Sequence, residues 1–429
     1  MPEPSSKPAL LLDISRLVWR ARRRGPTGID RVELAYAEHF LRGENGRSVF
    51  AVVHILGFLI AISPLSAQRF VAELACRWSG ETTAARTGGL GLLIRVYWPL
   101  VAGRWAFGPW LRRSIRKTGA SPIFLVVSHH HIARRSTIGR IRRIFRARTA
   151  CLIHDLIPVE YPEYFKHGWE HRYRRLSSNV GRLFDAVITN SESTARSLRT
   201  CLGSDLSHLS RLALCTSPLG VRAFRRAQRA AMRAPEGAYF VVVGTIEPRK
   251  NHLLLLNLWA RLASSVPEPP RLLVIGARGW ENEQVVDMLE RSRRLRGYVE
   301  ERSGLSDADV GALVHGARAL LLPSFAEGFG LPLAEALATG VPVICSDIPV
   351  FRELGREVPE YLDPLDVHAW SEIILDYGRP DSSRRAAQLA RLEHWTPPRW
   401  ADHFARVEKL LDSLDAGREG VADSAAQPA

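Results

Sequence analysis

The sequence predicts an α/β protein with two domains, each built on a parallel sheet covered by helices. Short apolar runs rich in β-branched residues alternate with helical patterns along the chain, as is typical of buried parallel strands. These runs form two series, separated by a basic and Ala-rich stretch at 218–238. With 429 residues, 46% of them hydrophobic, the chain is long enough to bury two sizeable cores.

The first series of apolar runs lies before residue 220. Its clearest expected strands are at 9–15, 122–129, 150–155 and 185–190. The longest apolar run, 50–62, is interrupted by His54 and Gly57, and it is shorter than the roughly 20 residues that a membrane-spanning helix needs. We expect this run to be a buried strand that continues into a helix.

The second series follows the basic stretch and repeats the same alternation. Its expected strands are at 239–244, 271–276, 317–323 and 341–347. The predicted organisation is an N-terminal domain at 1–220, a linker at 221–238, a C-terminal domain at 239–398, an amphipathic helix at 399–415 and a disordered tail at 416–429. The two domains are both expected to be doubly wound.

The positive charge of the chain is concentrated in its first half. The net charge is +15, and residues 1–220 hold 33 Lys and Arg against 15 Asp and Glu. Such asymmetry indicates an anionic partner, which could be a membrane face, a phosphorylated substrate or nucleic acid. The segment Leu92–Lys117 mixes tryptophans with arginines, which suits a lipid headgroup interface, and Ala133–Arg148 is a second basic helix. The alternative is that both are core helices with a solvated basic edge.

The cysteines and the N-terminus bear on the compartment. Five cysteines without paired spacing indicate a reducing environment and argue against a zinc site. The first residues lack the basic region and apolar stretch of a secretory signal. We therefore expect a cytoplasmic protein, peripheral on the inner face of the membrane if its basic helices bind lipid.

Two glutamates follow the expected strand at 317–323, at the edge of the sheet where ligands bind in open α/β folds. The stretch EGFGLPLAEAL places Glu327 before Gly328 and Gly330, and Glu335 about one and a half turns into the next helix. The glycines allow a tight turn, and the free N–H groups of the helix start can hold phosphate. Carboxylates on either side of that start could grip both rings of a sugar nucleotide. The alternative is that Glu327 caps the helix and Glu335 lies on the surface.

Two other strand ends and one helix start carry residues suited to the same cleft. Gly244 ends a strand, and Arg249 and Lys250 follow in the turn to the next helix. Two adjacent cations there suit a diphosphate leaving group, unless they are solvated loop residues. His154 ends the strand at 150–155 and can act in hydrogen bonding or acid–base chemistry. Gly28 opens a further helix toward the cleft.

Two stretches invite a metal-site interpretation that their context does not support. His129, His130 and His131 are adjacent, and adjacent side chains of an extended chain point to opposite faces. The DAD at 307–309 follows Leu305 and Ser306 and opens a helical pattern, which favours a helix cap. We expect no metal site.

Together these motifs match a known family. The chain resembles the family-four retaining glycosyltransferases of the GT-B fold, the mannosyltransferase-like glycosyl transferases group 1. The matching pieces follow the order of the family over nearly the whole chain: PTGIDRVELAYAEHF, LIHDLIPVEYPEYF, AVITNSESTARSL, PLGV, FVVVGTIEPRKNHLLLL, GLSDADVGALVHGARALLLPSFAEGFGLPLAEALATGVPVICSDIPVFREL and YLDPLD.

The resemblance implies two Rossmann-like domains with the active site between them, a nucleoside diphosphate sugar as donor, and no metal or other cofactor. It implies contact of Glu327 with the donor sugar hydroxyls and of Glu335 with the ribose. Arg249 and Lys250 correspond to the cationic pair at the diphosphate, and His154 to the histidine near the transferred sugar. The other donor-binding positions are Gly28, Gly244, Gly328, Phe329, Gly330 and Leu331.

The activity implied by the resemblance is retaining transfer of a hexosyl group, with mannosyl as the leading candidate, to a polysaccharide or glycolipid acceptor. Same-face attack assisted by the leaving phosphate is the implied mechanism, because these motifs contain no evident nucleophilic carboxylate. The chain departs from the family at Thr245, where many members carry arginine after the glycine. Arg249 is expected to supply that charge.

Other classes fit the sequence less well. A dinucleotide oxidoreductase would need G-x-G-x-x-G after a strand, and no such stretch occurs. A pI near 10.2 favours a nucleic-acid-binding protein, but no recognition motif accompanies the charge, so no nucleic-acid partner is expected. A catalytically inactive protein that binds sugar nucleotides is the remaining alternative.

Overall fold

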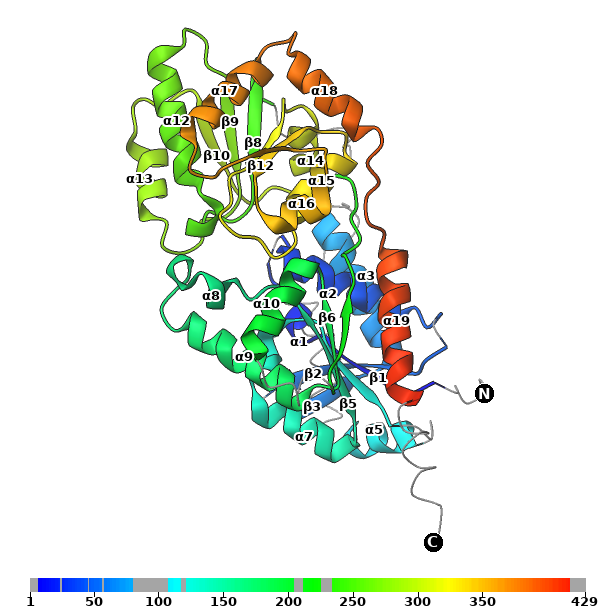
Figure 1. Cartoon of the computed structure of the whole chain (residues 1–429). Coiled ribbons are helices and arrows are strands. Elements are labelled where there is room, and N and C mark those ends of the chain that lie inside the picture. Colours follow the sequence, from blue (N-terminus) through cyan, green and yellow to red (C-terminus); the bar gives the residue numbers. More distant parts are fainter. Residues whose placement is uncertain are drawn as a thin grey trace.

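The computed structural model of the protein describes residues 7–23, 25–44, 46–55, 58–79, 107–116, 121–203, 211–224 and 234–416. Within these ranges the chain forms two α/β lobes, with the N-terminal lobe at the bottom of Figure 1 and the C-terminal lobe at the top. Most of the basic segment Leu92–Lys117, the middle of the predicted linker (225–233) and the predicted tail from residue 417 lie outside the described residues.

The N-terminal lobe contains a seven-stranded sheet with the order β3-β2-β1-β4-β5-β6-β7. The strands are β1 (Leu10–Asp13), β2 (Val49–Ile55), β3 (Phe58–Ile62), β4 (Ile123–Val126), β5 (Arg148–Ile153), β6 (Ala186–Thr189) and β7 (Ala213–Thr216). All neighbouring pairs are parallel except β2 and β3. Every residue of β1, β4 and β6 is buried, as expected for parallel strands covered on both faces.

The prediction for the apolar run 50–62 is wrong in its second half. This run forms an antiparallel hairpin, in which Ala51 pairs with Ile62 and His54 with Leu59. Five residues are too few for a stable helix, and the free edge of β2 offers backbone hydrogen bonds to β3. The strand therefore continues into a second strand.

Helices surround the N-terminal sheet. They are α1 (Ser15–Arg20), α2 (Gly28–Leu41), α3 (Pro64–Ser79), α5 (Phe107–Arg116), α6 (His129–Ile132), α7 (Arg135–Phe145), α8 (Ile157–Glu160), the 3₁₀ turn η2 (Pro162–Tyr164), α9 (Trp169–Leu183) and α10 (Glu192–Leu202). A reciprocal capping box between Thr27 and Asp30 starts α2 and places Gly28 at its first position.

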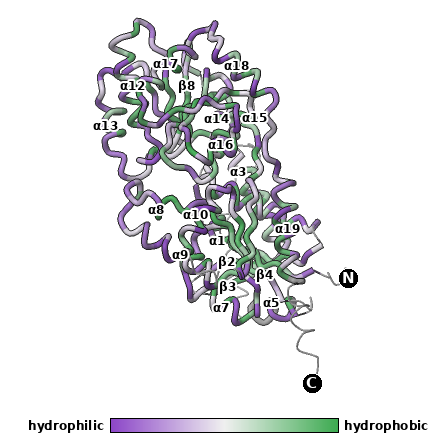
Figure 2. Tube along the Cα trace, in the orientation of Figure 1, coloured by the Kyte–Doolittle hydropathy of each residue, from purple (hydrophilic) through white to green (hydrophobic). Residues whose placement is uncertain are grey.

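The C-terminal lobe contains a six-stranded parallel sheet with the order β10-β9-β8-β11-β12-β13. Its strands are β8 (Tyr239–Val243), β9 (Arg271–Ile275), β10 (Val299–Arg302), β11 (Leu320–Leu322), β12 (Val343–Ser346) and β13 (Glu360–Leu362). Its helices are η3 (Pro248–Lys250), α12 (His252–Ser265), α13 (Glu283–Arg291), α14 (Asp307–His315), α15 (Leu331–Ala338), α16 (Pro349–Gly355), α17 (Val367–Gly378) and α18 (Ser383–Leu392). Figure 2 shows hydrophobic colouring along the strands of both lobes and hydrophilic colouring on many outer segments.

The last helix, α19 (Trp400–Ala416), returns to the N-terminal lobe. The imidazole of His403 lies 2.7 Å from the hydroxyl of Tyr36 on α2, and Glu408 lies 2.6 Å from His39. The two lobes are thus joined by two neighbouring chain crossings, where Val221 N–H donates to Pro398 O at 3.0 Å. No helix in the described ranges combines the length and the hydrophobicity that a membrane span requires.

Both sheets have a point where the strand order reverses. In the N-terminal lobe this switch point lies between β1 and β4, and in the C-terminal lobe between β8 and β11. Ligands of open α/β sheets bind outside the carboxyl ends of the strands at such points. The residues that follow these four strands are therefore the first place to look for function.

Candidate active site

At the β8/β11 switch point, three charged side chains form a buried cluster, called here the C-lobe charge cluster (Arg249, Lys250 and Glu327). Lys250 pairs with Oε1 of Glu327, and Nη1 of Arg249 lies 2.8 Å from Oε2. The Ser324 hydroxyl donates to the same carboxylate at 2.9 Å. The Glu327 side chain is only 8% exposed. Both cations come from η3 after β8, and the carboxylate comes from the loop after β11.

The charges in this cluster stabilise one another. Burial alone would raise the pKa of Glu327, but Arg249 and Lys250 lower it to about 2. Burial opposes the charge of Arg249, yet Glu327 and Glu247 raise its pKa above the ordinary value. For Lys250, burial lowers the pKa although Glu327 opposes that shift. Glu327 is therefore an acceptor-only carboxylate at neutral pH.

The glycine loop after Glu327 packs directly against the N-terminal lobe. A Cβ at Gly328 would lie 2.5 Å from the carbonyl oxygen of His154, so only glycine fits this contact. The hydroxyls of Ser191 and Thr194 donate to Gly328 O at 3.1 and 3.2 Å. Gly330 has a φ of 94° and precedes α15, which starts at Leu331. The loop thus forms part of the contact between the lobes.

His154 presents a neutral imidazole. Its Nε2 donates to Val127 O at 2.7 Å, and burial lowers its pKa to about 4. Nδ1 therefore carries no proton, and among the described residues it has no hydrogen-bond partner. The His154 backbone is held by His129, whose Nε2 accepts its N–H at 2.9 Å, and by Asn190, which donates to its oxygen. This imidazole can accept a hydrogen bond but is a poor acid.

Glu335 lies apart from the charge cluster and is paired across the lobes. Its Oε1 accepts from Nη1 of Arg31 at 2.8 Å, and Nη2 of Arg31 reaches Asp307 at 2.6 Å. Burial raises the pKa of Glu335 to about 7, and Arg31 limits that rise. The Nε of Arg31 is buried without a partner. Ser306 caps α14 by accepting from Asp309 N–H at 3.2 Å. Asp307 is therefore not needed as the cap and can bind Arg31.

Sequence reasoning missed two residues that face this region. Arg31 lies three residues after Gly28 at a helix start, and that position was the only available signal. Asp155 follows His154, and its Cβ lies 2.9 Å from the position that a Cβ on Gly328 would take. Burial raises the pKa of Asp155 to about 6, an effect that Glu327 adds to and Arg249 opposes. Asp155 is thus a carboxyl group of the N-terminal lobe whose charge interacts with the charge cluster.

Some of the predicted site residues lie at or near two cavities, and the others lie in or beside the charge cluster. A Cβ built on Gly28 would lie 3.3 Å from Cδ1 of Leu331. Leu331 and Glu335 line a cavity of ≈ 440 Å³. Gly244, with φ of 147°, lies beside Lys250 in the charge cluster. A second cavity of ≈ 290 Å³ is lined by Phe329 and Ser191, among others. Neither of these two cavities is lined by the charge cluster or by His154.

Aromatic residues close the outer side of the same junction. The rings of Tyr164 and Phe325 stack with centroids 5.2 Å apart, and the Trp280 indole donates to Tyr164 O at 3.1 Å. Within the described ranges, no group of three or more His, Cys, Asp or Glu is placed to hold a metal ion. The independence of metal stays a prediction.

Solved structures place the architecture in a known fold class. Over 96% of this chain and 99% of the other, the protein is similar to HepE of Anabaena in complex with UDP and glucose (TM-score 0.57, 13% identity). It is also similar to sucrose-phosphate synthase of Thermosynechococcus elongatus, over 75% and 78% of the two chains (TM-score 0.51, 18% identity). Two parallel-sheet lobes of this kind define the GT-B fold, and the predicted fold class is confirmed.

A match to a protein family lies in the second half of the chain. Residues 224–374 match the family described as Glycosyl transferases group 1, and the chain carries a domain of that family, as predicted. The chain is 38% identical over 149 residues to O-antigen chain mannosyltransferase B of Escherichia coli, which is 35% of this chain and 39% of that protein. It is 33% identical over 154 residues to O-antigen chain mannosyltransferase RfbU of Salmonella typhimurium, 34% of this chain and 40% of that protein. The chain thus spans two fifths or less of the length of these relatives.

Proposed function

We propose that the protein is a retaining glycosyltransferase that moves a hexosyl group, mannosyl in the first instance, from a nucleoside diphosphate sugar to a polysaccharide or glycolipid acceptor. The observation that carries this proposal is the C-lobe charge cluster at the β8/β11 switch point. The mannosyltransferase names of the relatives support the sugar and the acceptor class. The structure of HepE with UDP and glucose supports a nucleotide sugar as donor.

The charge cluster suits a diphosphate and a sugar at once. A diphosphate would compete with Glu327 for Arg249 and Lys250, since both cations form charge-assisted hydrogen bonds to phosphate. The released carboxylate accepts hydrogen bonds only, so it would bind the hydroxyls of the transferred sugar. The unprotonated Nδ1 of His154 would accept from another hydroxyl. Glu335, beside the ≈ 440 Å³ cavity, would bind the ribose in place of Arg31.

The charge cluster would promote transfer by stabilising the leaving group. The bond between the anomeric carbon and the diphosphate breaks with its electron pair going to the phosphate oxygen. Arg249 and Lys250 offset the negative charge that develops there. The acceptor hydroxyl attacks the oxocarbenium-like carbon from the same face, and its proton goes to the departing phosphate oxygen. In this mechanism the chain supplies electrostatics and positioning, with no metal and no cofactor.

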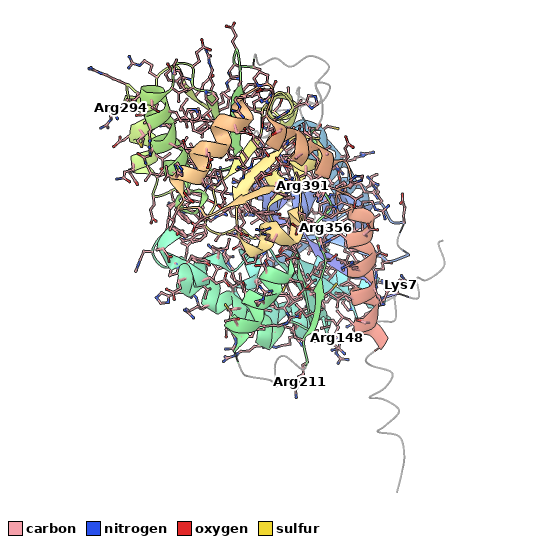
Figure 3. The ribbon with its side chains drawn as sticks, turned by 45° about the horizontal axis from the view of Figure 1, so that its top comes forward. Lys7, Arg148, Arg211, Arg294, Arg356 and Arg391 are labelled. Carbon is pink, nitrogen blue, oxygen red and sulfur yellow. The ribbon has the colours of Figure 1, made fainter. Side chains whose placement is uncertain are left out.

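A basic face on the N-terminal lobe suits an anionic membrane surface. The helices α5 and α7 lie together at the bottom of Figure 1, and no acidic residue occurs in either. The exposed arginines on and beside them are Arg112, Arg113, Arg116, Arg134, Arg135, Arg140, Arg143 and Arg146. Ile144 on α7 is 41% exposed among them. Figure 3 shows Arg148 and Arg211 toward the same end, far from Arg294 at the tip of the other lobe. Localisation at the inner face of the cytoplasmic membrane would follow.

A nucleotide panel tests the proposed activity. We expect at least one nucleoside diphosphate to raise the thermal midpoint of the protein in the presence of EDTA, since a ligand that binds only the folded state stabilises it. A panel of nucleotide sugars should then identify a donor by hydrolysis or transfer. Duplex DNA serves as the comparison ligand. A midpoint raised by DNA and by no nucleotide would favour the nucleic-acid alternative instead.

Vesicle flotation tests the membrane surface. The protein should float with vesicles that contain anionic lipid, more strongly at low salt than at high salt, and should not float with zwitterionic vesicles. Replacing Arg112, Arg113 and Arg143 by glutamine should weaken flotation. Equal flotation of this variant and the unchanged protein would show that α5 and α7 are not the docking face.

A further inference from the structure

Aromatic side chains from both lobes pack together beside the charge cluster. They are called here the aromatic bridge (Tyr164, Phe165, Trp169, Trp280 and Phe325). The first three belong to the N-terminal lobe, in or next to η2 and at the start of α9, and the other two lie in the loops after β9 and β11. The backbone N–H of Phe325 donates to Arg249 O at 2.8 Å. The bridge therefore begins directly at the charge cluster.

Trp280 joins the two lobes through both ring stacking and a hydrogen bond. Its ring centroid lies 5.6 Å from that of Trp169 and 5.9 Å from that of Phe165, separations at which aromatic pairs attract one another. Its indole N–H donates to Tyr164 O at 3.1 Å, which fixes the orientation of the ring. The Tyr164 ring stacks in turn on Phe325. The C-terminal lobe thus holds the segment η2–α9 at two points.

The stack of rings continues from the bridge along α9 to His154. Trp169 and Tyr173 lie one turn apart on α9, and their ring centroids are 6.2 Å apart. The Tyr173 hydroxyl lies 3.2 Å from Nδ1 of His129. The rings of His129 and His154 are 5.3 Å apart. A line of packed rings therefore runs from Trp280 in the C-terminal lobe to His154 in the N-terminal lobe.

Hydrogen bonds along this line fix the tautomers of both histidines. The His154 backbone N–H donates to Nε2 of His129 at 2.9 Å, so this nitrogen carries no proton. Burial lowers the pKa of His129 well below its ordinary value. Its ring is therefore neutral, and its one proton lies on Nδ1, facing the Tyr173 hydroxyl. His154 has the opposite tautomer, because its Nε2 donates to Val127 O. Tyr173 thus holds His129, and His129 holds the His154 backbone.

The same contacts determine where His154 lies relative to Glu327. Phe325 precedes Glu327 by two residues in the loop after β11, and Tyr164 of the other lobe stacks on it. In the proposed function, His154 and Glu327 accept hydrogen bonds from hydroxyls of one sugar. The distance between their acceptor atoms must therefore match that sugar. A misplacement of about 1 Å can lower the rate about 100-fold.

We propose that Trp280 and Tyr173 are positioning residues that couple the contact between the lobes to the placement of His154 beside the donor sugar. Trp280 holds the start of α9, and Tyr173 on the same helix holds His129. His129 in turn holds the backbone N–H of His154. The proposal rests on the proposed glycosyl transfer, since it concerns the histidine assigned there to the transferred sugar. Neither positioning residue is catalytic, because each acts through His154.

Histidine NMR tests the coupling without a donor. In protein with isotope-labelled histidines, long-range proton–nitrogen spectra at neutral pH should show His129 protonated at Nδ1 and His154 at Nε2. The signals are assigned by their loss in His129→Gln and His154→Gln. We expect Trp280→Ala and Tyr173→Phe to shift the His154 signals. Unchanged His154 signals in Trp280→Ala, or a proton on Nε2 of His129, would overturn the proposal.

Two substitutions within the C-terminal lobe are the matched controls. The Trp395 indole is half-buried and donates to Leu354 O at 3.1 Å, and the buried Tyr239 hydroxyl donates to Leu313 O at 2.8 Å. Trp395→Ala and Tyr239→Phe therefore remove groups like those removed at Trp280 and at the tyrosine of α9. Both controls should leave the His154 signals in place. Trp280 is half-buried in a loop, so its replacement should leave both lobes folded.

Kinetics give a second readout once a donor is known. We expect kcat to fall about tenfold in Tyr173→Phe and about 10- to 100-fold in Trp280→Ala. The donor KM should stay within about twofold, because the charge cluster is unaltered. Trp280→Phe retains a ring and should recover part of the lost kcat. Unchanged kcat in Trp280→Ala would overturn the proposal. The absence of a thermal shift with any nucleoside diphosphate would instead contradict the proposed function, while the NMR spectra would still test the coupling.

Discussion

At the β8/β11 switch point the side chains are charged and paired with one another, whereas at the β1/β4 switch point several are uncharged and two are unpaired. Arg249, Lys250 and Glu327 form ion pairs at the first. Glu33 and His54 lack partners at the second. Because both sheets reverse their strand order beside the first strand of the lobe, the topology determines where a ligand can bind, and the residue types determine which ligand binds there.

The comparison also separates two ways of preparing a site. In the C-terminal lobe the cations are held ready by a carboxylate that an incoming diphosphate can replace. In the N-terminal lobe Asp13 is held by His131 at 2.6 Å and by the hydroxyl and N–H of Ser15. The contact at Gly328 joins the two lobes, because its carbonyl accepts from Ser191 and Thr194 of the other lobe. Substitutions in the charge cluster, at the Gly328 contact and at the helix caps test these contributions separately.

The largest effect is expected from removing a member of the charge cluster. Lys250→Ala and Glu327→Ala should each lower kcat by at least about 100- to 1,000-fold, because loss of one preorganised electrostatic group has effects of that size. A sugar-transfer assay measures this, and circular dichroism checks the fold. Arg278→Ala is the control, since Arg278 forms exposed ion pairs with Glu290 and Glu301 on the same lobe. Full turnover in either cluster variant would contradict the assigned site.

A single methyl group at Gly328 should have the next largest effect. The added Cβ would lie 2.5 Å from His154 O, so the lobes could not keep the close contact that this glycine allows. We expect Gly328→Ala to lower kcat/KM for the donor at least about tenfold, consistent with the sensitivity of transfer to small misplacements. Gly139→Ala is the control, because nothing lies within 4 Å of its Cβ and it is in the helix α7. Equal activity of the two variants would show that lobe contact at Gly328 is not needed.

A moderate effect is expected in the pH dependence of stability. The pKa of Glu327 is about 2 in the folded protein against an ordinary value of 4.5. Its contribution to the free energy of unfolding is therefore present above pH 4.5 and is lost as the pH falls toward 2. Glu335, whose pKa is raised to about 7, has the opposite sign: its contribution is present below pH 4.5 and is lost as the pH rises through 7.

Thermal midpoints measured from pH 3 to pH 8 check these signs. The difference between the unchanged protein and Glu327→Gln should shrink toward low pH. For Glu335→Gln, the unchanged protein should lose stability relative to the variant as the pH rises toward 7. A difference that stays constant across this range in both variants would contradict a depressed pKa at Glu327 and a raised pKa at Glu335.

The sequence was sufficient for the central part of the fold and insufficient at its edges. The strands β1, β4, β5, β6, β8, β9, β11 and β12 all lie within or overlap predicted ranges. The strands that were missed or mistaken, β3, β7, β10 and β13, are the edge strands of their sheets. The edge strands β7, β10 and β13 are only partly buried, and polar residues weaken the apolar signal of β10, VEER at Val299–Arg302. The strand β3 was mistaken although FLIAI is apolar, because a short apolar run does not distinguish a strand from a buried helix. A local pattern also contains no information about which neighbour completes a sheet.

The site was predictable to the extent that strand ends determine it. The pairing of Lys250 with Glu327 follows from their positions after β8 and β11, which are neighbours in the sheet. The pairing of Glu335 with Arg31 could not be predicted, because the two residues are 304 positions apart and meet only when the lobes pack. The same holds for Asp13 and His131, since no spacing rule links residue 13 to residue 131. Contacts between distant segments need the tertiary structure.

The smallest predicted effect distinguishes the role of Ser191 as a helix cap from its role in the contact between the lobes. Ser191 caps α10 by accepting from Thr194 N–H at 3.0 Å, and Ser306 caps α14 in the same way. Each serine-to-alanine change should lower the free energy of unfolding by about 1 kcal/mol, the usual cost of losing such a cap. Of these two serines, only Ser191 also donates to Gly328 O across the lobes. Ser191→Ala should therefore raise the donor KM by a few fold, about the effect of one net hydrogen bond, whereas Ser306→Ala should leave it unchanged. Equal donor KM values in the two variants would show that the Ser191 contact serves stability alone.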